Sequence, residues 1–407
     1  MTTVATELTA KQDIPTISLV SWAHGTSHFF HLMLPSLFPF FIRDFGLSYT
    51  EAGLLMTVFF VASGVGQALS GFVVDRLGAA RVLYGGMTFL ALSGLVVFLA
   101  SSYHLLMVAA LLAGSGNAVF HPVDYSILNR RVSRPRLAHA FSMHSLAGNL
   151  GWAAAPPVML GVASLANWHV AGLVASIIAL GTLALLISQR HLLHYELITT
   201  RGQTPTARGL TPNASSLFAF MKVRAVWMSF AFFFFSTTAF GALQNYVAPL
   251  LSNLYGLSLA AATACLTGYL LGSSAGVVVG GFLASKARSH GRIIATALAV
   301  GALMAALVAT AVPPAWSVIV LLSIMGFGVG IASPSRDLMV REATAHSLGH
   351  SALGRVYGFV YSGLDTGLAM SPLMFGPLMD RSHFSAVLFG VALLQGMAIL
   401  TALTVGE

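Results

Sequence analysis

Hydrophobic positions along this chain fall into long runs that are separated by short polar turns. A run of about 20 apolar residues is long enough to cross the hydrocarbon core of a bilayer as a helix. Backbone groups must be paired within lipid, so these runs are predicted to be helices. The sequence predicts twelve of them, over residues 18–43, 49–74, 80–101, 104–129, 136–164, 168–189, 222–252, 257–284, 290–312, 315–340, 351–378 and 383–405.

One long polar stretch, over residues 190–221, interrupts this pattern. Its composition is typical of a flexible linker without a core of its own. We therefore expect an N-terminal six-helix bundle over residues 1–189 and a C-terminal six-helix bundle over residues 222–407. The remaining loops are short, which makes consecutive helices antiparallel neighbours.

The two predicted bundles share an internal repeat. Gly46-Leu-Ser and Gly256-Leu-Ser lie 210 residues apart, and each is followed by an apolar run that ends near a Gly-Phe pair. The offset grows to 216 residues at Asn149 and Asp365. Further pairs keep the same order: Pro39 with Pro249, Gly66 with Gly276, Gly114 with Gly326, Gly116 with Gly328, Pro122 with Pro334, Gly151 with Gly367, and Pro156 with Pro372. Parallel repeats of hydrophobic helices are typical of two-bundle transporters.

Composition supports a membrane protein. Apolar residues make up 57% of the chain and charged residues only 8%, against about 25% charged in soluble domains. The only cysteine, Cys265, excludes an internal disulfide and argues against a metal site built from cysteines. The first 17 residues are polar and the next apolar run is too long for a signal-peptide core, so no cleavage is expected.

Basic residues predict the orientation, because they are retained on the cytoplasmic side. Arg43 and Arg381 alone fall in loops of the opposite side, which places both termini in the cytoplasm. The net charge of +8 therefore reflects topology and not nucleic-acid binding. The basic residues assigned to the cytoplasmic side are Arg76, Arg81, Arg130, Arg131, Arg134, Arg136, Arg190, Arg201, Arg208, Lys222, Arg224, Lys286, Arg288, Arg292, Arg341 and Arg355.

The run Gly71-Phe-Val-Val-Asp75-Arg76-Leu-Gly78-Ala-Ala-Arg81 resembles the loop 2/3 signature of the major facilitator superfamily. This resemblance spans the whole chain and implies two six-helix bundles that alternate between inward-open and outward-open states. It also implies that Asp75 and Arg76 latch the bundles in the outward-open state, while Arg81 anchors the loop at the headgroups. The alternative is that this loop is only a topology anchor.

Within the superfamily, Gly114-Ser-Gly116-Asn-Ala-Val-Phe120-His121-Pro122 resembles the fosmidomycin-resistance branch of efflux proteins. Ala147-Gly148-Asn149-Leu150-Gly151 with Pro156 also fits that branch, and resembles a signature of proton-coupled antiporters. The chain departs from the branch in three places. Val123 and Asp124 follow the Phe-His-Pro run where the branch has Glu, His31 replaces an acid, and Ala155 replaces a glycine.

Helices 1, 4, 7 and 10 line the central cavity in this superfamily, so their polar residues are the first candidates for binding substrate or protons. Helix 1 carries His24, His28 and His31, whose spacing places them on one stripe. These imidazoles are candidates to handle protons or substrate, to bind a transition metal, or to form a polar lining with structural hydrogen bonds.

Helix 4 offers Asn117, His121 and Asp124. A carboxylate within a membrane span is costly and is by default a functional hypothesis. The alternative is that Asp124 pairs locally with Arg130 or Arg131.

Helix 10 offers Arg336 and Asp337, and the repeat places Arg336 opposite Asp124. One hypothesis is a gate formed by Asp124 and Arg336; the other is that Arg336 binds an anionic substrate such as a carboxylate or phosphonate. A local pair between Arg336 and Asp337 is not expected, because side chains one residue apart point about 100° away from each other.

Two further groups complete the candidates. Gln244 and Asn245 of helix 7 are expected to face the cavity. Asp365 of helix 11, with Tyr361 one turn earlier, is a second candidate proton site, and its alternative is an interhelical hydrogen bond like that suggested by its repeat partner Asn149.

The sequence thus predicts a monomeric secondary transporter in a bacterial inner membrane, with lipid as its solvent. We expect it to export a small organic compound, with a lean towards an anion, in exchange for protons. The alternative is a proton symporter that imports an organic acid or other metabolite. No phosphate-binding loop, bound metal or cofactor is expected, and neither is an enzymatic activity.

Overall fold

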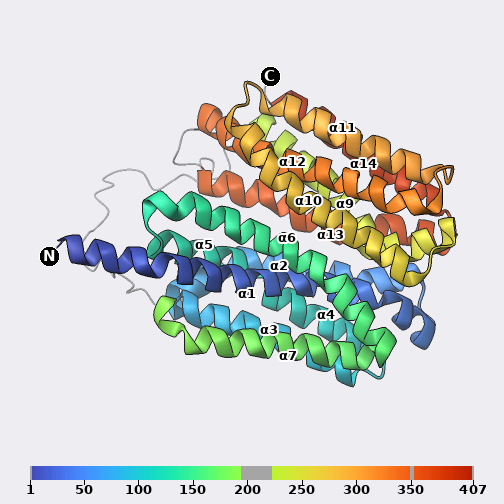
Figure 1. Ribbon diagram of the computed structural model, residues 1–407, viewed down its shortest axis with the longest axis horizontal. Coiled ribbons are helices and arrows are strands. Elements are labelled where there is room, and N and C mark those ends of the chain that lie inside the picture. Colours follow the sequence, from blue (N-terminus) through green and yellow to red (C-terminus); the bar gives the residue numbers. More distant parts are fainter. Residues whose placement is uncertain (1, 194–221, 349–352, 406–407) are drawn as a thin grey trace.

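The structure, a computed structural model, describes residues 2–193, 222–348 and 353–405. These residues form helices with short connections, and no strand occurs among them. Figure 1 shows long helices running side by side along the longest axis of the molecule. They are α1 (Thr2–Phe45), α2 (Tyr49–Leu77), α3 (Ala79–Leu99), α4 (Tyr103–Asn117), α5 (Phe120–Arg131), α6 (Leu137–Leu165), α7 (Trp168–Ser188), α9 (Arg224–Tyr255), α10 (Leu259–Ser285), α11 (His290–Ala309), α12 (Val318–Leu348), α13 (Leu353–Asp380) and α14 (Phe384–Val405).

Ten spans of the described residues are long and apolar enough to cross a membrane, and α4 and α5 together make one of them. The helices α1 and α13 lie outside that set of ten, although each contains one of the predicted spans. The all-helical membrane fold is therefore confirmed. The count of twelve spans and the cytoplasmic location of the termini stay predictions.

The repeated Gly-Leu-Ser sequence acts as a stop and a start for helices. Gly46 and Gly256 both have φ of +65°, the left-handed conformation that ends a helix at little cost for glycine. Ser48 and Ser258 then cap the next helices by accepting a backbone N–H three residues later, at 3.1 and 3.2 Å. The two copies of the repeat thus fold alike at this turn.

The predicted single helix over residues 104–129 is broken. The α-helical pattern ends at Asn117 and resumes at Phe120, with a two-residue turn between α4 and α5. Pro122 explains the break, because its ring clashes with the carbonyl of Ala118 and it has no N–H to donate. Other helices extend the predicted spans: α1 begins at Thr2 and α12 continues to Leu348.

Glycines let helices approach closely at equivalent places in the two copies of the repeat. A Cβ added at Gly114 would collide with the carbonyl oxygen of Phe59, and one added at Gly326 would collide with that of Tyr269. Phe59 and Tyr269 are themselves 210 residues apart, so the repeat is preserved in the packing as well as in the sequence. Small residues at such crossings are typical of helix association in lipid.

Two helix pairs make the main contacts between the first half, up to residue 193, and the second half, from residue 222. They are α2 with α13 and α6 with α10, which lie side by side in the middle of Figure 1. Residues 194–221, which include most of the predicted linker, lie outside the described residues. The division into residues 1–189, 190–221 and 222–407 accordingly remains a prediction.

The contact of Gly114 with α2 predicts a stability difference between two glycine-to-alanine variants. We expect Gly114→Ala to lower the free energy of unfolding by about 1–3 kcal/mol, because overpacking forces the helices apart. Gly85→Ala is the matched control, since a Cβ at Gly85 meets nothing within 4 Å. Melting temperatures in detergent measure both. Equal melting temperatures for the two variants would contradict the close crossing.

Candidate functional site

The three histidines of α1 lie on one face, as predicted, and all three are buried. The ring centroids of His24 and His28 are 4.2 Å apart, and those of His28 and His31 are 4.8 Å apart. Trp152 of α6 stacks on His28 at 4.4 Å. The helix 1 histidines therefore form one continuous aromatic and polar surface that faces α6.

Asp124 of α5 is completely buried and contacts two histidines from other helices. Its Oδ2 lies 3.0 Å from Nε2 of His144 and 3.4 Å from Nδ1 of His24. The alternative pairing with Arg131 is wrong, because Arg131 donates instead to Oε1 of Gln12 and to the carbonyls of residues 191 and 192. The break before α5 contributes to this arrangement, since it sets the direction of the helix that carries Asp124.

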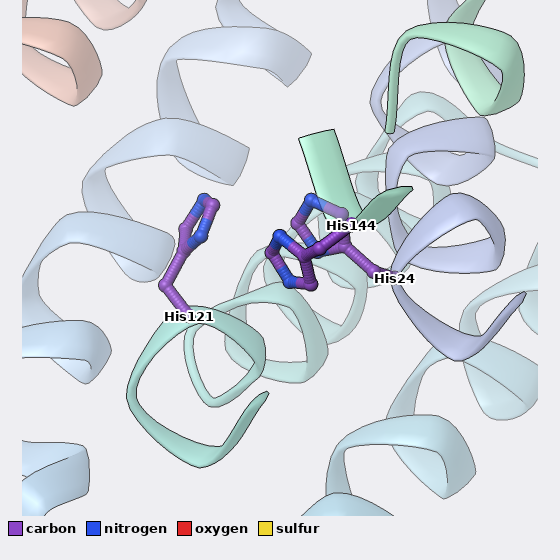
Figure 2. A group of neighbouring side chains, drawn as sticks. All are labelled: His24, His121 and His144. Atoms are coloured by element: carbon purple, nitrogen blue, oxygen red, sulfur yellow. The ribbon is translucent and has the colours of Figure 1, made fainter. Parts of the chain in front are cut away.

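His24, His121 and His144 form a group that we call the histidine cluster. One ring nitrogen of each lies within 4.8 Å of the others. Figure 2 shows the rings of His24 and His144 overlapping, with His121 beside them. The three side chains come from α1, α5 and α6, and the His24 and His144 rings stack with centroids 3.6 Å apart.

Sequence reasoning missed His144. It lies one helical turn before Gly148, and that spacing was the available signal, because residues four apart share a helix face. Gly148 faces the same histidines: a Cβ there would lie 2.7 Å from Nδ1 of His28 and 3.0 Å from Nε2 of His24. The Ala147-Gly148-Asn149 run thus lies where α6 packs against α1, and His144 lies on the same face of α6.

A second polar group is built around Asn117, at the end of α4. Its Oδ1 accepts from Ser27 at 2.6 Å and from Nε2 of His31 at 2.8 Å, and its Nδ2 donates to Ser63 at 2.8 Å. His31 must therefore carry its proton on Nε2 when neutral. The amide ties α1, α2 and α4 together.

The predicted residues of helix 7 are buried where the two halves meet. Gln244 donates to the backbone carbonyl of His31 at 3.0 Å and so links α9 to α1. Asn245 is also buried, and neither of its side-chain amide atoms has a hydrogen-bond partner among the described residues.

Arg336 and Asp337 do form the local pair that the sequence argued against. Nε of Arg336 lies 2.9 Å from Oδ1 of Asp337, and Tyr361 donates to the same oxygen at 3.1 Å. The prediction failed because it considered only the directions at Cβ, whereas the long arginine side chain can bend back to its neighbour. The guanidinium also lies over the ring of Phe233, 4.7 Å from its centroid.

The hypothetical gate between Asp124 and Arg336 is not closed by a direct pair in this structure. Asp124 contacts histidines of its own half, and Arg336 contacts Asp337. Tyr125, next to Asp124 in α5, packs its ring near those of His121 and His144, with centroids 6.0 and 5.3 Å away.

The remaining predicted residues are more scattered. Asp365 lies against α2, where a Cβ on Gly64 would be 3.3 Å from that of Asp365. Arg76 and Arg81 are exposed. The side chain of Asp75 lies outside the part that the structure describes, so the latch of the loop 2/3 signature stays a prediction.

A family model for the Major Facilitator Superfamily matches residues 20–372. The chain belongs to this superfamily. Solved structures of superfamily-like fold agree: the nucleoside transporter NupG superposes with a TM-score of 0.75 at 12% identity, covering 96% of this chain and 98% of that one. A bacterial homologue of the lysosomal transporter Spinster, inward-facing and occupied, gives 0.72 at 14% identity, with 96% of both chains covered. At these identities the likeness concerns the fold alone.

Among curated proteins, this superfamily member is similar to the fosmidomycin resistance protein of Escherichia coli (strain K12), as the helix 4 motif predicted. The two are 25% identical over 283 residues, which cover 68% of this chain and 66% of that protein. A probable L-galactonate transporter of the same organism is 25% identical over 127 residues, 31% of this chain and 28% of that one. The chain thus spans less than two thirds of the length of either relative.

One contact between the halves was missed by sequence reasoning altogether. The carboxylate of Asp380, at the end of α13, accepts the N–H of Tyr49 at 2.6 Å, the N–H of Thr50 at 3.2 Å and the hydroxyl of Thr50. It therefore caps the N-terminus of α2, where the helix dipole favours a negative charge. Tyr246 of the second half also donates to the carbonyl of Tyr49 at 3.2 Å. We call this set of contacts the Asp380 latch.

The Asn117 group predicts a stability loss. We expect Asn117→Ala to destabilise the protein by about 1–3 kcal/mol, because it leaves buried groups of Ser27, His31 and Ser63 without their partner. Asn129→Ala is the control, since Asn129 is exposed and bonds only to a carbonyl of its own helix. Thermal melting in detergent measures both, and a shift no larger than that of the control would refute the role of Asn117.

Proposed function

We propose that this superfamily member exports a small organic anion in exchange for protons, as a monomer in a bacterial inner membrane. The observation that carries the proposal is the burial of the Asp124 carboxylate against His24 and His144. The matched relatives include a resistance protein and a probable transporter, which favours transport over an enzymatic activity.

The Asp124 group has the chemistry that proton coupling requires. An ionisable group in a membrane span faces a large desolvation cost and tends to be paired and functional. A proton that arrives at this carboxylate or at a neighbouring imidazole changes the charge of a site without water to screen it. Such a change favours one packing of the helices over another, and that difference is what couples a proton to alternating access.

Arg336 is our candidate for recognising the anion. Its planar guanidinium can bind a carboxylate or phosphonate through two parallel N–H groups. The contact with Asp337 uses Nε, and the ring of Phe233 supports the guanidinium from one face.

Proton-coupled uptake is the second candidate. It is supported by the similarity to a protein named as a probable L-galactonate transporter, whose name refers to an organic acid. The same carboxylate and arginine would serve either direction, so only a flux measurement separates the two.

Alternating access also requires the contacts between the halves to break. We propose that the Asp380 latch closes one end of the transporter. It lies at the turns between α1 and α2 and between α13 and α14, which the distribution of basic residues assigns to the non-cytoplasmic side. Opening at that end would separate the carboxylate from the N-terminus of α2.

The role of Asp124 is tested by proton movement in proteoliposomes that contain a pH-sensitive dye, with phosphonates and organic acids as substrates. We expect Asp124→Asn to slow substrate-linked proton flux by about tenfold or more, since a hydrogen bond to a charged group contributes about 1.5–3 kcal/mol. Asp44→Asn is the control, because Asp44 pairs with Arg43 and accepts from Trp168 outside the cluster.

Proton flux opposite to substrate supports export, whereas flux in the same direction supports uptake. Substrate movement that carries no protons in the wild type would refute proton coupling. Coupled flux that survives in Asp124→Asn would remove Asp124 from the mechanism.

The Asp380 latch is tested by measuring the distance between spin labels at Leu165→Cys and Val312→Cys in a Cys265→Ser background. Both sites are highly exposed, at 91% and 80%. Asp380 is exposed to water, so we expect Asp380→Ala to weaken closure by about 1 kcal/mol, which shifts the ratio of open to closed molecules about fivefold. Asp44→Ala is the control at the same end. An unchanged distance distribution in Asp380→Ala would argue against a latch.

A further inference from the structure

We propose that the histidine cluster, together with Asp124, binds one divalent transition-metal ion of the Zn²⁺ and Co²⁺ type. The proposal does not depend on the direction of transport or on the substrate. It rests on three imidazoles from three helices that meet inside the first half of the protein, and on the Asp124 carboxylate, which contacts two of them.

The ligand set is the first argument. Three imidazoles and one carboxylate make a four-ligand set of the kind that holds zinc in proteins. Imidazole nitrogen favours zinc, copper, nickel and related ions, whereas magnesium and calcium prefer sites built from oxygen. The set His24, His121, His144 and Asp124 therefore selects for a transition metal.

The distances are the second argument. One ring nitrogen from each of the three histidines can be selected so that all three atoms lie within 4.8 Å of one another. Ligand atoms about 2.1 Å from a tetrahedral zinc ion are separated by about 3.4 Å. Each of these three side chains would thus move inward by roughly 1 Å or less, and the Asp124 carboxylate already lies 3.0 Å from Nε2 of His144 and 3.4 Å from Nδ1 of His24. His24 and His144 are now stacked (Figure 2), so their rings must also turn until the two lone pairs converge.

The unmet hydrogen-bonding capacity of the site is the third argument. Nδ1 of His121 and Oδ1 of Asp124 are buried and have no hydrogen-bond partner among the described residues, and Nδ1 of His24 lies 3.4 Å from Oδ2 of Asp124 without forming a hydrogen bond. Leaving such groups unpaired in a buried site is unfavourable. Coordination of an ion can use these atoms directly, or can reorient the rings so that the other nitrogen is used.

This site differs from the one that the sequence suggested. The sequence offered His24, His28 and His31 as a metal-binding stripe. In the structure Nε2 of His31 is bonded to Asn117, and the His31 ring lies between Phe59 and Phe60, so this residue is committed to another network. His28 packs between His24 and Trp152, where it shields the cluster.

The test is a titration of the purified full-length protein with Co²⁺, after removal of any affinity tag. We expect one Co²⁺ per chain, with the intense visible absorption of a four-coordinate ion, and displacement by Zn²⁺. His121→Gln and His144→Gln should each weaken binding by more than the 10–100-fold that loss of a supporting contact costs. His104→Gln and His169→Gln are controls, because neither histidine belongs to the cluster.

Zn²⁺ should also raise the melting temperature of the wild type and the controls, but not of the cluster variants. Unchanged Co²⁺ affinity in a well-folded His121→Gln variant would overturn the proposal, and so would absorption typical of six-coordinate surface binding. If His144→Gln does not fold, the half-buried His121 carries the test alone. The titration needs no transport substrate. If the protein binds Co²⁺ but moves no protons, the metal-site proposal therefore stands and the proposed function is refuted.

Discussion

Lipid offers no hydrogen-bonding partner, and this constraint accounts for most features of the structure. Backbone groups are paired within helices, and polar side chains gather where they can pair with one another. Asn117 satisfies three neighbours at once, and Asp124 lies against two histidines instead of facing the bilayer. The same constraint that organises the fold thus concentrates the reactive groups in the interior of the first half.

Helix packing by small residues makes this concentration possible. The crossings of α4 with α2 at Gly114 and of α6 with α1 at Gly151 bring backbones close together, and Gly148 lets the rings of His24 and His28 lie against α6. In lipid such contacts are a main source of helix association, because there is no hydrophobic driving force between the helices. The glycines therefore position the histidines and Asn117, although they carry no chemistry themselves.

The two halves share their packing but not their polar content. Phe59 and Gly114 have their counterparts in Tyr269 and Gly326, and both Gly-Leu-Ser turns adopt the same backbone. The histidine cluster, by contrast, belongs to the first half, while the arginine that sits opposite Asp124 in the repeat belongs to the second. The histidine cluster and Arg336 thus lie in different halves of the protein.

The sequence by itself determined the membrane class, the superfamily, the order of the helices and several of the buried polar residues, among them the helix 1 histidines, Asn117 and Asp124. These follow from local properties: run length, glycine and proline placement, and the cost of polar groups in lipid. It could not show that Arg336 bends back to Asp337, or that Asp380 caps a helix more than 300 residues away in the chain. Nor could it place His144 beside Asp124, because that contact depends on the direction of α5 after its break and on how closely α6 packs against α1. Only the tertiary structure decides such contacts, because they depend on side-chain conformation and on how the helices pack, and neither follows from separation along the chain.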